Sequence, residues 1–415
     1  MVTQYILILC IVICLFIFGY IKLMYPFWNN QPVYHSYDFI RQFYREPFVI
    51  NQYQPGKTKY FDPIRVKTYN FRETDMAVKK QVTNAIQCFY LNTDKILHTI
   101  HQDDIQAILS GQSQSSFVSL YCENHYIQEF DASGSRITKN NLSLGTITSR
   151  HLHFWYVNKW KQKHHFVEMP MYMLDYLCVN RNKEQVNIYR KLLQTHEYNQ
   201  RCINPSVSCS LIKKEIELFS GIVPFVQYKT YTFKLRNSRV QPLPKGYFIV
   251  ELNKENMDKY VDFFYNNPDY CSKTELYDVM VFPDVGNITE MVERKLMKVF
   301  CLQGNNQVYG FYFFKDAKMY YEELEGNTLH FVASVMNCLS PPVFYNGFTR
   351  CIQMILKKDE SYQMLLFENL GHNTILLPLW TNNYSPIFDN KTAYYLYNMV
   401  FPGSPLTNKR VFILQ

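Results

Sequence analysis

MPMYMLDYLCVN, residues 169–180, is an almost unbroken apolar and aromatic run that carries a single charge, Asp175. Such a run, bounded by polar residues, is typical of a buried strand. The residues that follow, roughly 183–200, are expected to form a helix. Two earlier strands, SFVSLYCEN (116–124) and SLGTITSRHLHFWYV (143–157), follow helices over 76–110. This mixture of strands and helices predicts an α/β (α+β) fold around a mixed sheet.

The second half of the chain repeats this order loosely. In each half a strand with one glycine, Gly145 or Gly310, precedes a second apolar strand, although the two halves share no sequence identity. We therefore expect two related units, residues 25–225 and 226–415, after an N-terminal segment 1–24. The expected elements of the second half are a helix at 257–267, strands at 297–303, 307–321, 328–338 and 363–369, and a helix at 341–358.

The composition indicates a folded protein with a large core. The chain has 415 residues, of which 47% are hydrophobic and 17% aromatic. Its formal net charge is +8, which suits an anionic ligand or an anionic membrane face. Lysine and arginine are scattered, so no nucleic-acid partner is expected. The eleven cysteines contain no CxxC pair, which argues against a zinc ribbon and favours reduced thiols.

The N-terminus has the properties of a membrane anchor. YILILCIVICLFIFGYI (5–21) has no charged residue and spans about 26 Å as a helix. Lys22 and several aromatic residues follow it, as expected at a membrane interface. A cleaved signal peptide is the alternative, but MVTQ has no basic residue and no small-residue cleavage site follows the run. We expect a single-pass anchor within residues 5–24 and a cytosolic main body; a lumenal glycoprotein is the alternative.

The opposite end, KRVFILQ (409–415), is apolar almost to its last residue. Chain termini are usually polar and solvated. We expect Val411 to Leu414 to be buried, which carries the terminal carboxylate of Gln415 toward the interior. An edge strand that closes a sheet is the alternative reading of this stretch.

Three stretches together resemble the N-myristoyltransferase family of glycylpeptide acyltransferases, which consist of two acetyltransferase-like (GNAT) halves. YPFWNNQPV (25–33), with REPF (45–48), is similar to the segment that opens the family's catalytic domain. LDYLCVN (174–180) is similar to a family strand that ends in Phe-Leu-Cys-Val. AYYLYNMV (393–400) and the terminal VFILQ are similar to the family's Tyr-Tyr-Leu-Tyr-Asn-Trp motif and short apolar tail.

The resemblance implies direct transfer of a myristoyl-type acyl group from acyl-CoA to a protein's N-terminal glycine. It makes the carboxylate of Gln415 the general base, with Leu414 and Asp175 near the peptide. The backbone amides of Tyr176 and Leu177 would stabilise the oxyanion of the thioester carbonyl. A catalytically inactive, membrane-anchored binding protein of the same fold is the alternative function.

For the acyl-CoA side, the resemblance implies contacts from Phe27, Trp28, Asn29, Cys178, Val179, Arg181 and Lys183. The chain departs from the family in the loop after the strand, where a basic run is replaced by the stretch 184–187, which begins with Glu184. A carboxylate there repels a phosphate, so the altered loop favours the inactive alternative. No tightly bound cofactor is expected, with acyl-CoA acting as a co-substrate.

Histidines cluster in RHLHF (150–154) and KHHF (163–166). His151 and His153 share one strand face, but solvated hairpin histidines are the expected reading, and no metal site is predicted. A Cys178–His196 nucleophile is also discounted, because direct transfer needs no covalent enzyme intermediate.

Overall fold

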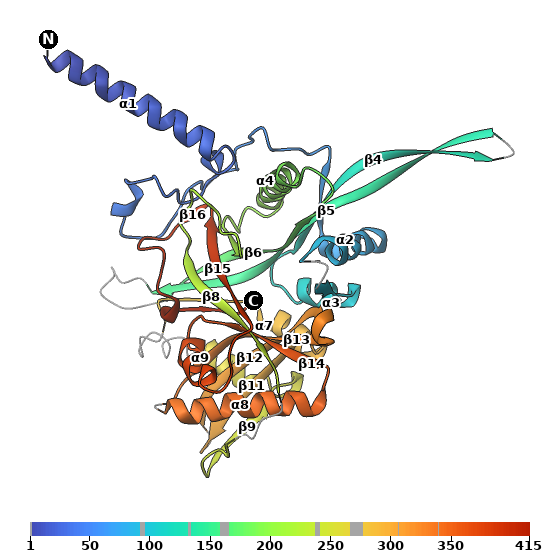
Figure 1. Cartoon of the computed structure of the whole chain (residues 1–415), viewed down its shortest axis with the longest axis vertical. Helices are drawn as coiled ribbons and strands as arrows, with labels where there is room; N and C mark the ends of the chain where they lie inside the picture. Colours follow the sequence, from blue (N-terminus) through green and yellow to red (C-terminus); the bar gives the residue numbers. More distant parts are fainter. Residues whose placement is uncertain are drawn as a thin grey trace.

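The computed structural model describes residues 2–91, 96–131, 134–157, 166–236, 241–265, 277–305, 307–338 and 340–415. Helix α1 (Val2–Met24) projects from the body as a separate rod, and the hairpin of β4 and β5 projects on the opposite side (Figure 1). The stretch Gln4–Met24 of α1 is long and apolar enough to cross a membrane, and its apolar side chains are exposed.

Fifteen of the described strands join in one mixed sheet. Its main path has the order β17-β10-β5-β6-β7-β15-β8-β14-β13-β12-β11-β9, and β2, β3 and β4 lie off this path. Strand β2 extends the sheet through β4, and β3 pairs with β12. The predicted mixed sheet is therefore confirmed. The strands are β2 (Val66–Asn70), β3 (Ile96–His98), β4 (Phe117–Asp131), β5 (Gly134–Val157), β6 (Phe166–Val179), β7 (Ser210–Glu215), β8 (Val226–Lys234), β9 (Tyr247–Glu251), β10 (Val279–Phe282), β11 (Met297–Gly304), β12 (Gln307–Tyr321), β13 (Gly326–Met336), β14 (Tyr362–Glu368), β15 (Phe388–Tyr397) and β17 (Val411–Ile413).

The sheet crosses the predicted boundary at residue 225 without interruption. Strand β15, from the end of the chain, lies between β7 of the first half and β8 of the second. Strands β10 and β17 extend the sheet beyond β5. The division into two units thus stays a prediction, since one hydrogen-bonded sheet carries strands from both halves.

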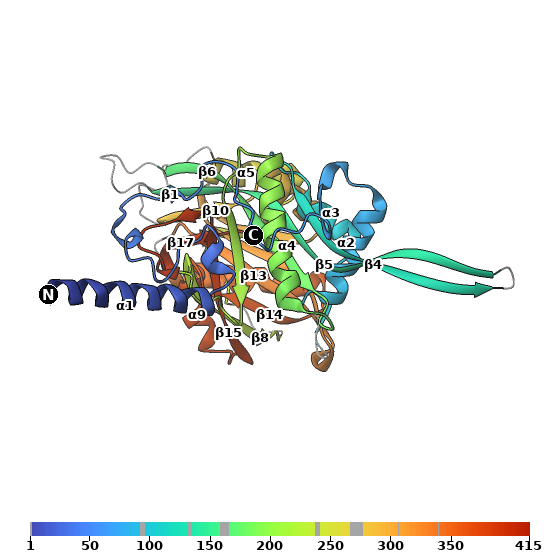
Figure 2. The ribbon, with the colours of Figure 1, turned by 90° about the horizontal axis from the view of Figure 1, so that it is seen from above.

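Helices cover the sheet at both ends (Figures 1 and 2). Helix α4 packs on β2, β4, β5 and β6, whereas α8 packs on β9, β11 and β12. In α8 the residues Phe344, Phe348, Cys351 and Ile355 are buried at spacings of three and four, so they form one apolar stripe. The helices are α2 (Met76–Phe89), α3 (Gln102–Leu109), α4 (Gln185–Ile203), α5 (Asp258–Phe264), α7 (Val285–Glu293), α8 (Pro341–Lys358) and α9 (Asn373–Thr381).

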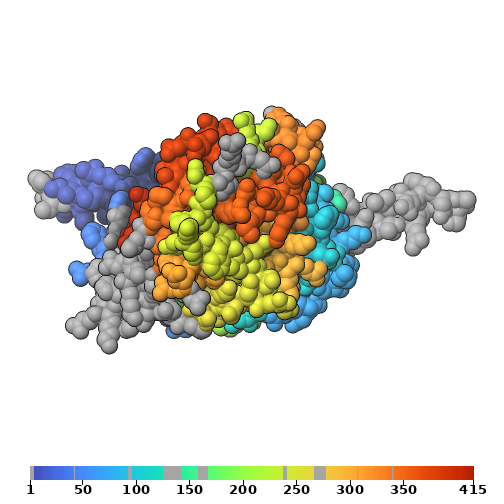
Figure 3. All heavy atoms as spheres, turned by 90° about the horizontal axis from the view of Figure 1, so that it is seen from below, coloured from blue at the N-terminus to red at the C-terminus, as the bar shows by residue number. Residues whose placement is uncertain are grey.

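The second half of the chain covers most of the face seen in Figure 3, with residues of the first half at its sides. The N-terminal lead-in from residue 25 to 70 is mostly irregular, as its prolines indicate. It contains a short 3-10 helix at Trp28–Asn30 and the two-residue strand β1 (Phe48–Val49), which pairs with β16 (Met399–Val400). The first and third predicted motifs therefore lie close together in the fold.

Candidate active site

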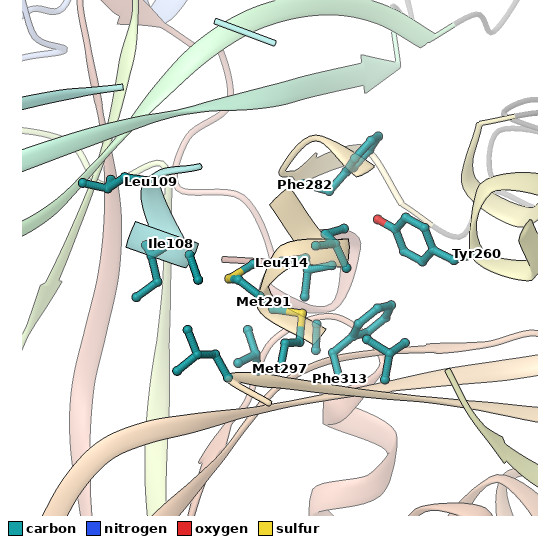
Figure 4. Packing of buried hydrophobic residues seen from close by; sticks show 14 of the residues in the cluster. Ile108, Leu109, Tyr260, Phe282, Met291, Met297, Phe313 and Leu414 are labelled. Atoms are coloured by element: carbon teal, nitrogen blue, oxygen red, sulfur yellow. The ribbon is translucent and has the colours of Figure 1, made fainter. Parts of the chain in front are cut away.

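The end of the chain is inside the protein, as its sequence predicted. Strand β17 pairs in parallel with β10, and the amide of Leu414 donates to the carbonyl of Val281 over 2.8 Å. Leu414 is completely buried, and Gln415 is 7% exposed. In Figure 4 Leu414 lies among Met291, Met297 and other core residues. The terminal strand thus holds the last residue of the chain in a fixed, enclosed position.

A β-bulge interrupts β6 at the residues predicted to bind an oxyanion. A register shift between Thr146 and Thr148 places two β6 residues, Tyr176 and Leu177, opposite one residue of β5. Tyr176 has φ of 51°, which is uncommon for a residue with a side chain. A bulge locally disrupts the ladder of hydrogen bonds. The two amides therefore lie at an irregular position of the strand, as the oxyanion prediction requires.

The carboxylate of Asp175, beside the bulge, already has a cationic partner. Nε of Arg150 lies 2.8 Å from Oδ2 of Asp175, and the Arg150 side chain is 1% exposed. Arg150 also reaches α7, where its Nη1 lies 3.4 Å from Oδ1 of Asn287. An incoming ammonium at Asp175 would therefore share the carboxylate with Arg150. The contact of Asp175 with the peptide stays a prediction.

A second buried ionic cluster surrounds Glu368 at the end of β14. Its Oε1 accepts from Nζ of Lys213 over 2.6 Å and lies 2.8 Å from Nε2 of His330. The side-chain amide of Gln415 donates to the same oxygen over 3.4 Å. Burial raises the pKa of this carboxyl, but the Lys213 charge and the His330 hydrogen bond outweigh burial and hold it well below its usual range. Glu368 is thus an anion beside the end of the chain.

Lys315, on β12, lies close to both ionic clusters. Burial lowers the pKa of Lys315 to about 8, and the charges of Arg150 and Lys213 act in the same direction, against those of Asp175 and Glu368. Within the residues that the structure describes, its ammonium makes no hydrogen bond or ion pair. The charge interactions of Lys315 therefore connect the Arg150–Asp175 pair beside the bulge with Glu368, which contacts Gln415. Sequence reasoning missed Arg150, Lys213, Lys315 and Glu368, because nothing in their local sequence distinguishes them from ordinary surface charges.

The residues predicted to contact acyl-CoA gather around the first turns of α4. Phe27 is 2% exposed and packs against Trp28 and Tyr60 at ring distances of 4.9 and 5.1 Å. Arg190 of α4 lies over the rings of Phe27 and Tyr60. Val179 and Cys178 end β6 immediately before this helix. The structure therefore brings the first and second motifs to the same end of α4, although their contacts with a ligand stay predictions.

The cations near that helix are only partly available to an anion. Lys191 pairs with Asp62 over 2.9 Å, and Lys183 lies 3.8 Å from Glu123. Arg181 is exposed, and Asn29 is half-buried. Glu184 occupies the N-cap position of α4 without capping it by its side chain. A negative charge thus stands where a helix N-terminus would attract phosphate.

The side chains of Cys178 and His196 have different partners. Cys178 donates to the carbonyl of Ala85 over 3.7 Å, and Nδ1 of His196 lies 2.8 Å from the hydroxyl of Ser119. Burial raises the pKa of the Cys178 thiol and lowers that of His196 to about 3. Neither shift suits a thiolate–imidazolium pair, which agrees with discounting this nucleophile.

The expectation that the clustered histidines are solvated is wrong for His151 and His153. His151 is 3% exposed, and both side chains converge on Asp284. Strand β10 pairs with β5 in the register that brings Asp284 there, which the sequence could not show. His164 and His165 lie outside the described residues.

Comparison with known proteins gives a result for the fold. No family model and no curated protein matches the sequence. Solved structures of Saccharomyces cerevisiae N-myristoyltransferase are similar to the whole chain. One, with bound myristoyl-CoA, has a TM-score of 0.65 and 11% identity over 94% of this chain and 99% of that chain. Another, with myristoyl-CoA and inhibitors, has a TM-score of 0.64 and 11% identity over 96% and 98%. The chain therefore has the fold of N-myristoyltransferase, as its three motifs predicted.

Proposed function

We propose that the protein is a membrane-anchored acyltransferase that moves a myristoyl-type acyl group from acyl-CoA to the N-terminal glycine of a protein. The observation that carries the proposal is the buried chain end. A strand that encloses the last residue of a protein in a charged region is unusual, since termini are normally solvated. The shared fold supports the same reading, because the similar yeast enzyme binds myristoyl-CoA.

In the proposed reaction the glycine ammonium first gives a proton to the terminal carboxylate of Gln415. The neutral amine then attacks the thioester carbonyl, and the amides of Tyr176 and Leu177 stabilise the oxyanion. The intermediate collapses to an amide and expels the CoA sulfur, which takes up the second proton of the nitrogen and leaves as the thiol. Asp175, paired with Arg150, and Glu368, paired with Lys213, supply carboxylates that the ammonium would share with these cations.

Membrane anchoring is supported by a surface next to α1. Tyr25, the residue after α1, stacks on Tyr37 with ring centroids 5.9 Å apart. The loop that follows Tyr37 exposes four apolar side chains around a hollow of about 300 Å³, namely Phe39, Ile40, Phe43 and Tyr44. Exposed aromatic residues beside a membrane-spanning helix fit a position at the bilayer interface. We propose that this loop rests on the membrane that α1 crosses.

The test is acyl transfer by the full chain in nanodiscs, with a native C-terminus and any tag placed before Met1. Myristoyl-CoA and a peptide beginning with glycine are the substrates, and a peptide beginning with proline, whose amine is secondary, is the control. Mass spectrometry should show an amide-linked acyl group on the glycine peptide alone. Two residues added after Gln415 should abolish the product, because they displace the carboxylate. A folded protein that gives no product contradicts the proposal and points to the inactive alternative.

A further inference from the structure

We infer that His151, His153 and Asp284 form a zinc-binding site, separate from the proposed active site. Nδ1 of His151 lies 2.8 Å from Oδ2 of Asp284, and Nε2 of His153 lies 3.2 Å from Oδ1. Imidazole nitrogens and a carboxylate are ligands that Zn²⁺ prefers, and three protein ligands with one open position are common for this ion. The inference does not depend on the proposed acyl transfer.

The spacing of the three side chains fits a tetrahedral ion. Two ligand atoms at about 2.0 Å from a tetrahedral zinc lie about 3.3 Å apart. The candidate ligand atoms of His151, His153 and Asp284 all lie within 4.8 Å of one another. Only small movements are therefore needed for one ion to replace the protons that join the histidines to Asp284. His153, whose side chain is 18% exposed, leaves the site open to solvent for a water ligand.

The surroundings have the features that support a metal site. The other nitrogen of His153, Nδ1, lies 2.6 Å from Oε1 of Glu168, which fixes the ring and directs Nε2 toward Asp284. Metal-bound histidines almost always have such an outer partner. Phe282 stacks on the His153 ring with centroids 5.8 Å apart, so one wall of the site is apolar. His151 would bind through Nδ1, and its Nε2 is buried and has no hydrogen-bond partner among the described residues, so the outer partner of the site is on His153.

The site lies where the neighbouring strands β5, β6 and β10 meet the start of α7. His151 and His153 come from β5, Glu168 from β6, and Asp284 from the turn before α7. One turn further along α7, Asn287 donates to backbone carbonyls at the end of α3 and contacts Arg150. A zinc ion would therefore fix the start of α7 against the sheet. It would also hold Asn287 in place, the α7 residue that contacts Arg150 of the Arg150–Asp175 ion pair.

The test uses the full chain in nanodiscs, purified without a polyhistidine tag and supplied with Zn²⁺. Mass spectrometry of the metal content should give about one zinc per chain, and Co²⁺ should produce the visible absorption of a four-coordinate site. Asp284→Asn and His153→Gln should lose the ion, whereas Asp258→Asn, at an exposed position, is the matched control and should keep it.

A further variant separates loss of zinc from loss of folding. Glu168→Gln changes a side chain that is 54% exposed, so the protein should fold. Its zinc affinity, measured by competition with a chelator, should fall about 10- to 100-fold. Zinc content that is unchanged in Asp284→Asn and His153→Gln would assign the ion to exposed thiols such as Cys202 and overturn the inference. A folded wild-type protein that takes up no zinc would overturn it as well.

Discussion

The amide of Leu414 and the carbonyl of Val281 form a 2.8 Å hydrogen bond that fixes the penultimate residue of the chain next to β10, the second strand in the order of the sheet. Strands β17 and β10 run parallel, and paired residues such as Val279 and Val411 are 132 positions apart in the sequence. The chain end is therefore positioned by tertiary structure in the same way as a side chain on a rigid element.

Leu414 should contribute strongly to stability, because its side chain is completely buried in the main core cluster. Leu414→Ala should lower the free energy of unfolding by about 2 to 5 kcal/mol, measured by urea denaturation. Ile387→Ala is the control, since Ile387 is 51% exposed and should cost far less. Equal effects for the two variants would show that the terminal strand is not docked as described.

Arg150 and Asp175 should depend on each other energetically. Arg150→Met leaves the Asp175 carboxylate without its partner beside the bulge and should destabilise the protein by about 3 to 5 kcal/mol. The double variant Arg150→Met/Asp175→Asn removes both charges and should recover part of that loss. The free energy of unfolding is measured for the parent, both single variants and the double variant, which together form a double-mutant cycle. Additive effects would contradict the ion pair.

Glu184 should weaken binding of acyl-CoA, because it places a negative charge at the N-terminus of α4. Glu184→Lys should tighten binding of myristoyl-CoA about 5-fold, which corresponds to the usual effect of charge at a helix terminus. Calorimetry at two salt concentrations measures this gain, which should shrink at high salt. Glu255→Lys, in the second half of the chain, carries the same charge change and should leave affinity unaltered.

Lys315 should make peptide binding depend on pH. Its pKa is lowered to about 8 by burial and by the charges of Arg150 and Lys213. As pH falls below 8, Lys315 becomes protonated and repels the substrate ammonium, so the KM for a glycine peptide should rise between pH 9 and pH 7. Lys315→Met removes this charge, and its KM should change less over that range.

The same lowered pKa also has a consequence for folding. The unfolded chain binds a proton at Lys315 below about pH 10.4, whereas the folded protein does so only below about 8. This contribution to stability is therefore present above about pH 10.4, decreases as pH falls from there, and is lost once pH has fallen through about 8. Lys315→Met should be more stable than the parent at pH 7, and the gain should shrink toward pH 10. A gain that does not vary with pH would contradict the lowered pKa.

Much of the fold could be predicted from local sequence. The run 169–180 forms β6, the expected helix at 341–358 is α8, and the apolar end 411–414 is buried. These features depend on residue types that are close together in the chain, such as the stripe of α8 or the unbroken apolar run of β6. Periodicity and composition report them directly. The three motifs likewise indicated the N-myristoyltransferase fold, which the comparison confirmed.

The composition of the sites was decided by tertiary structure alone. Arg150 meets Asp175, and His151 meets Asp284, 133 positions further along the chain, because β5 lies between β6 and β10 in one particular register. A shift of one residue in that register would turn every one of these side chains to the other face of the sheet. The sequence by itself therefore determined which segments are strands, helices and buried ends. Only the order and register of the strands determined which charges meet, since that choice depends on packing across the whole sheet.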